Sequence, residues 1–158
     1  MPNLPHPAHR YNEDLHLKVP LLLWLAMFFL VRHFLILGIT FLPTTGEEIK
    51  ILRELIHPLY LLSDLPAGLV MLVAMRRRPE CADRGRRVWR LGRWLLGISA
   101  AGYLIFLSLN LFVTGRPLHL ALNELLLLSI LLHLGILGYL IRSGLLRDLF
   151  DDFPEAKR

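Results

Sequence analysis

The segment VPLLLWLAMFFLVRHFLILGITFL, Val19 to Leu42, decides the class of this protein. It is apolar over enough residues to cross a bilayer, since a helix rises about 1.5 Å per residue and the hydrocarbon core is about 30 Å thick. Two polar residues, Arg32 and His33, interrupt it. A cation at that depth is costly and requires a partner from another helix. The segment therefore predicts a membrane-spanning helix with a buried polar joint.

Three further apolar segments repeat this pattern along the chain. We predict spans over residues 19–42, 58–75, 94–113 and 118–141. On the third span, Gly97 and Ala101 form a small-x-x-x-small pair that is typical of close helix contacts in membranes. The predicted fold is a single domain, residues 1–158, of the all-α integral membrane class, built as a four-transmembrane-helix bundle.

The connecting segments carry their own signals. Residues 47–56 have apolar side chains at helical spacing and glutamates in the first turn, which predicts a short amphipathic helix at the outer surface. Residues 76–93 form an arginine-rich loop. The tail, residues 142–158, places its apolar side chains on one helical stripe, so we expect it to lie on the cytoplasmic interface or to dock a partner.

The distribution of basic residues predicts the orientation. Of the 18 Lys and Arg residues, fourteen lie in the two end segments and the 76–93 loop, and three lie in the other connections. Cytoplasmic loops carry such an excess, so we expect both termini and the loop inside, in a bacterial inner membrane. The basic loop then contacts phospholipid and not nucleic acid, with Trp89 and Trp94 as interfacial anchors.

Cysteine usage excludes one enzyme class. The chain has a single cysteine, Cys81. An internal disulfide is therefore impossible, and membrane thiol oxidoreductases that need cysteine pairs are excluded.

Polar residues inside the predicted spans are the candidate functional residues, because ionisable groups in a membrane are expensive. We expect an intramembrane polar cluster of Arg32, His33, His57, Tyr60, Asp64, Asn110, His119, Asn123 and Glu124. Its simplest role is structural, with Arg32 forming an ion pair with Asp64 or Glu124 that joins two helices.

Three more specific functions are alternatives to this structural role. In the first, Asp64 or Glu124 serves a small proton- or cation-coupled transporter. In the second, the two carboxylates act as acid and base in an intramembrane enzyme. His119 and His133 share a helix face at a spacing that suits haem ligands in a bundle, with His33 or His57 opposite. No catalytic residue, metal ligand or cofactor is assigned, because none of these patterns is complete.

The first quarter of the chain carries a resemblance. RYNEDLHLKVPLLLWLAMFFLVRHFLIL contains a tyrosine with acidic residues, then Leu-Lys-x-Pro, then an apolar run with Trp24 and Arg32. This segment resembles the N-terminal signature of the YfeZ-like family, small bacterial inner-membrane proteins of unknown function. The resemblance implies a bacterial inner-membrane location and transfers no functional residue.

We therefore expect a non-enzymatic polytopic membrane protein, an accessory, assembly or scaffold subunit. Its expected partners are the lipid bilayer and either another protein or further copies of itself. We expect this role for two reasons. The predicted spans have apolar faces with small residues that can pack against other helices, and no catalytic motif is complete.

Overall fold

The computed structural model of the chain describes residues 7, 10–11, 16–41, 58–77, 83–114 and 124–153. This part contains seven helices and no strand, apart from an isolated bridge between Tyr11 and Leu17. The all-α prediction is confirmed for these residues. The predicted outer amphipathic helix, residues 47–56, lies outside them.

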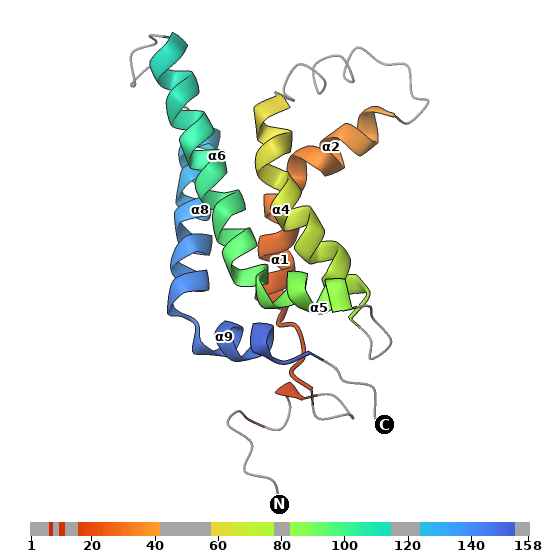
Figure 1. Cartoon of the computed structure of the whole chain (residues 1–158). Coiled ribbons are helices and arrows are strands. Elements are labelled where there is room, and N and C mark those ends of the chain that lie inside the picture. Colours follow the sequence, from red (N-terminus) through yellow and green to blue (C-terminus); the bar gives the residue numbers. More distant parts are fainter. Residues whose placement is uncertain are drawn as a thin grey trace, which may run out of the picture.

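Three helices are long and apolar enough to cross a membrane: α4 (Pro58–Met75), α6 (Gly92–Thr114) and α8 (Glu124–Arg142). α4 has the bounds predicted for the second span and stays one helix through Pro66. α6 packs between α4 and α8 (Figure 1). These three helices form the frame on which the first segment is placed.

The first apolar segment is not one straight helix, which corrects the prediction. It forms α1 (Leu21–Leu30) and α2 (Arg32–Thr40), which are bent by 58° at Val31. α1 runs beside α4 and α6, whereas α2 contacts α4 and then leans away from the long helices (Figure 1). Only together are α1 and α2 long and apolar enough to cross a membrane, so the described residues contain three to four candidate spans.

Two short helices close the lower end of the molecule. α5 (Asp83–Arg90) falls inside the predicted arginine-rich loop, and α9 (Gly144–Asp151) inside the predicted tail. Both lie across the ends of the long helices (Figure 1). The tail's apolar stripe packs within the chain, because Leu146, Leu149 and Phe150 are buried.

Gly92, at the start of α6, allows α9 to approach. A Cβ at this position would overlap the ring of Phe150 on α9. Gly97 is the opposite case, because a Cβ there would meet nothing within 4 Å. The predicted small-residue pair Gly97 and Ala101 therefore does not hold two helices of this chain together, and instead borders an open groove between α6 and α8.

Candidate functional site

The break at Val31 is held open by two side chains. In a straight helix the His33 amide would donate to the Phe29 carbonyl. Here the His33 amide donates to Asp64 Oδ2 on α4, at 3.0 Å. The Phe29 carbonyl accepts from Arg32 Nη1 at 3.1 Å. A carboxylate from another helix thus caps the N-terminus of α2, where the helix dipole favours negative charge.

The His33 side chain binds the same carboxylate. Its Nδ1 lies 3.1 Å from Asp64 Oδ2 and 3.2 Å from Oδ1, so the ring donates from Nδ1. The ring also stacks on Tyr60, at 5.3 Å, and on Tyr103, at 5.7 Å between centroids, and the two tyrosine rings are 5.2 Å from each other. Asp64 is 2% exposed. His33 and Asp64 are therefore a buried pair whose partners come from α2, α4 and α6.

Arg32 turns to the other side of the break. Its Nη2 donates to Ser129 Oγ on α8 at 3.2 Å, and its Nη1 lies 3.4 Å from His133 Nε2. The guanidinium also covers the rings of Phe29 and Tyr103, at 4.4 and 4.5 Å. Cation–π contacts of this kind are strongest when both groups are out of water.

The hydrogen bonds of His133 define its tautomer. Nδ1 lies 2.6 Å from the Ser129 carbonyl, which can only accept, so Nδ1 carries the proton. Nε2 is then the acceptor that faces Arg32. The neutral ring stacks on Tyr103 with 4.1 Å between centroids and 7° between planes. His133 thus stabilises the cation without adding a charge.

These contacts define the inner polar cluster, which joins α2, α4, α6 and α8. Its members are Arg32, His33, Tyr60, Ser63, Asp64, Tyr103, Ser129 and His133. Within the described chain, the buried side-chain atoms without a hydrogen-bond partner all lie outside it. The described residues also hold no group of three or more His, Cys, Asp or Glu that could bind a metal ion.

The structure brings together part of the predicted set. Arg32, His33, Tyr60 and Asp64 meet in the cluster. Asn110 and Glu124 are exposed, so they are not buried in it. His57, His119 and Asn123 lie outside the described residues.

The predicted ion pair of Arg32 is corrected. Among the ion pairs of the described residues, the Asp64 carboxylate pairs with His33. None of these ion pairs joins Arg32 to Asp64 or Glu124. The reason is the bend at Val31, which turns the His33 amide and ring toward α4 and Arg32 toward α8. Electrostatic attraction between Arg32 and Asp64 remains, across the cluster and without direct contact.

Sequence reasoning left four members out of the predicted set: Ser63, Tyr103, Ser129 and His133. Two signals were available. Ser129 and His133 are four residues apart, which puts them on one helix face. Tyr103 lies on a long apolar helix, where a phenol needs a partner when it is buried.

A second polar network holds the lower end together, around Asp152. This residue follows α9, and its carboxylate accepts from the Leu17 amide at 2.7 Å and lies 3.0 Å from His16 Nδ1. Arg77 Nη2 lies 3.3 Å from the same carboxylate, and Arg77 Nη1 donates to the Leu17 carbonyl at 2.6 Å. Burial lowers the pKa of Arg77, and the negative charge of Asp152 partly offsets this.

Trp89 on α5 completes this network and corrects another prediction. Its ring is fully buried, with 0% exposure, and does not lie at a lipid interface. The indole nitrogen donates to the Leu149 carbonyl at 2.9 Å, and the ring packs against Phe150 and under Arg77. The predicted anchor Trp94, in contrast, is 66% exposed.

Comparison with known proteins places the chain in a family. Residues 6–152 match a family model described as Protein of unknown function (DUF2919). The chain belongs to this family. The match spans all seven described helices of this DUF2919 protein. No curated protein and no solved structure matches the chain significantly. The family carries no known activity, and the YfeZ-like resemblance stays a prediction.

Proposed function

We propose that this DUF2919 protein is a non-enzymatic, multi-pass protein of the bacterial inner membrane, with four spans and both termini in the cytoplasm. α1 and α2 together make the first span, bent at Val31. It acts as an accessory, assembly or scaffold subunit, in a larger complex or as a homo-oligomer. The inner polar cluster is the internal joint that fixes the bundle.

One observation carries this proposal: the cluster is closed on itself. The charged groups Arg32 and Asp64 have partners from within the chain. A catalytic or transport site needs polar groups that a substrate can reach, and these are occupied. Buried polar groups that are fully satisfied serve to fix one arrangement of helices.

The outer surface supports the same conclusion. α8 is the least buried of the three long helices and packs chiefly on α6. Its exposed side chains include Leu128, Leu131 and Leu132, and the last two border a groove between α8 and α1. Gly135 lies among them, and a Cβ there would meet nothing within 4 Å. Lipid or the helices of a partner can cover such a face.

The test is purification of the full chain in mild detergent, with its mass and co-purifying proteins determined. We expect a defined complex or homo-oligomer that Gly135→Leu weakens, because the larger side chain fills the exposed groove between α1 and α8, where a Cβ meets no other atom within 4 Å. Gly38→Leu, on α2, is the matched control, since a Cβ at Gly38 also meets nothing within 4 Å. A monomer in detergent that also fails to cross-link in native membranes would refute the scaffold role.

A proton- or cation-coupled transporter is the second candidate, and the break at Val31 favours it. Membrane transporters place their ion sites at interrupted helices, where helix ends meet charged groups. Here the N-terminus of α2 meets the Asp64 carboxylate. If Asp64→Asn folds with normal stability and abolishes a proton-linked flux in vesicles, the transporter replaces the scaffold.

A further inference from the structure

Two neighbouring cavities on the lower half of the molecule have opposite chemistry. The first, of about 260 Å³, lies between α5, α6 and α9 and is lined by charged and aromatic residues. The second, of about 370 Å³, runs between α6 and α8 and is lined almost entirely by apolar ones. We call them the basic pocket and the α6–α8 groove. Arg93 and Trp94 line both, so the two cavities adjoin at these residues.

The basic pocket is built to receive an anion. Arg90, Arg93 and Arg147 line it, opposed by one carboxylate, Asp151. The ion pairs of the described residues do not include these side chains, so the guanidinium groups are available to a ligand. Guanidinium groups match the oxygens of a phosphate in a forked geometry.

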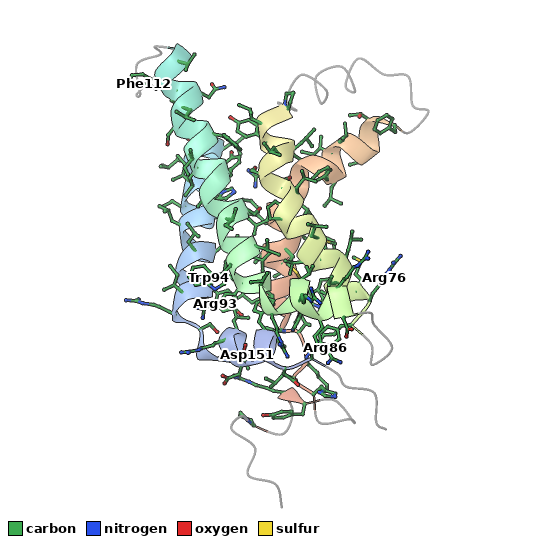
Figure 2. The ribbon with its side chains drawn as sticks, viewed as in Figure 1. Arg76, Arg86, Arg93, Trp94, Phe112 and Asp151 are labelled. Atoms are coloured by element: carbon green, nitrogen blue, oxygen red, sulfur yellow. The ribbon has the colours of Figure 1, made fainter. Side chains whose placement is uncertain are left out.

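The α6–α8 groove is built to receive a hydrocarbon chain. It is lined by Gly97, Ala101, Ile98, Leu137 and Ile141, and the open space at Gly97 forms part of it. Its lower end reaches Trp94, and Figure 2 shows Trp94 and Arg93 together near the lower end of α6, above Asp151. A tryptophan beside an arginine at this level is typical of the membrane–water boundary.

We propose that the basic pocket and the α6–α8 groove form one binding site for a single anionic glycerophospholipid, with its phosphate on the arginines and an acyl chain in the groove. The inference rests on the membrane location proposed above and is independent of the scaffold role. Basic pockets between helices on the cytoplasmic side are known to hold anionic headgroups. Neither a free phosphate nor an acidic peptide matches both cavities.

Asp151 sets the kind of headgroup. Its carboxylate repels a second negative charge and can accept a hydrogen bond from a hydroxyl group. The site therefore favours a headgroup with one negative charge and free hydroxyls, as in phosphatidylglycerol. Phosphatidylcholine lacks the hydroxyls, and its quaternary ammonium would meet the arginines.

The experiment measures phosphatidylglycerol bound to the purified full chain in a nonionic detergent, by native mass spectrometry. We expect about one tightly held lipid per chain. Arg90, Arg93 and Arg147 changed together to Gln should weaken it roughly 100-fold, from about five-fold for each arginine near an anionic headgroup. The control changes Arg76, Arg84 and Arg87 to Gln, three exposed arginines outside the pocket. It should weaken binding less than about two-fold.

Further measurements distinguish a lipid headgroup from free phosphate or an acidic peptide. Gly97→Phe fills the groove and should lower lipid binding at least ten-fold while thermal unfolding stays unchanged. Inorganic phosphate at millimolar concentration should not displace the lipid. Equal loss in both arginine triples would show diffuse surface charge, and full displacement by phosphate would show a free anion site. A stoichiometric acidic peptide in place of lipid would show a protein ligand, and each of these results overturns the proposal.

A separate experiment tests the membrane location. The wild-type chain should stay in the membrane fraction after alkaline carbonate extraction, and so should both arginine triples. Release of the wild-type chain would refute the membrane location itself, whereas retention of the chain with loss of the lipid contrast refutes only the site.

Discussion

Replacement of Asp64 by Asn tests the centre of the molecule, because this one carboxylate serves both the His33 amide and the His33 ring. It accepts from them at 3.0 and 3.1 Å, and Ser63 Oγ lies 3.4 Å from its second oxygen. An asparagine has the same shape and no charge. Both His33 donors lie close to Oδ2, so an amide oxygen in that place can still accept from both, but without the negative charge.

The magnitude follows from these bonds. Two hydrogen bonds to a charged acceptor become neutral, and the N-terminus of α2 loses its negative partner. Since charged bonds contribute about 1.5–3 kcal/mol and neutral ones about 1 kcal/mol, we expect Asp64→Asn to lower the free energy of unfolding by about 3 kcal/mol. His33→Phe keeps the stacking on Tyr60 and Tyr103 and removes only the ring donor, so we expect a loss of about 2 kcal/mol.

A double-mutant cycle separates the direct contact from distant effects. Unfolding of each variant is followed in mixed micelles by circular dichroism during a denaturing-detergent titration. We expect Asp64→Asn and His33→Phe to couple by about 1–2 kcal/mol, as contacting residues do. Arg32→Gln should couple to Asp64→Asn less strongly, because the two groups attract without touching. A larger coupling to Arg32 than to His33 would refute the contact geometry and restore the direct ion pair.

The remaining predictions concern the lower end and use the same unfolding assay. Gly92→Val should lower the free energy of unfolding by about 1–3 kcal/mol, because its side chain meets Phe150. The control Gly135→Val should change it by less than about 0.5 kcal/mol. Equal effects would contradict the packing of α9. Trp89→Phe should lower the free energy of unfolding by about 1–3 kcal/mol, because it leaves the buried Leu149 carbonyl without its donor. An unchanged stability would mean that the indole does not make this hydrogen bond. Arg77→Gln should make the connection after α9 accessible to protease in detergent, while the long helices stay protected; unchanged digestion would argue against the Asp152 network.

The three long helices α4, α6 and α8 follow from the sequence because hydropathy sets them. α4 begins at Pro58 and ends at Met75, as the apolar run does. The break at Val31 has no such signal, since neither proline nor glycine stands there. It depends on Asp64, a residue of another helix, and a local pattern cannot report such a partner.

The sequence identifies some residues of the candidate site, but it does not show which of them contact each other. Arg32 and Asp64 stand out because charge is rare in an apolar span. Which partner each takes depends on how the helices are rotated about their axes, and a bend of 58° changes that rotation for every residue after Val31. Trp89 was misplaced for a related reason, because tryptophan suits both a lipid boundary and a buried contact, and only the position of α9 decides between them.

The network around Asp152 has a consequence for biosynthesis. Its members come from the first described residues, from the end of α4 and from the segment after α9. A ribosome delivers Asp152 last, after the described helices have been synthesised. Until then the Leu17 amide and Arg77 lack this partner, so the lower end closes only after the seven described helices have been made. A chain that stops before Asp152 would therefore lack this closure, and its lower end would stay open to proteases.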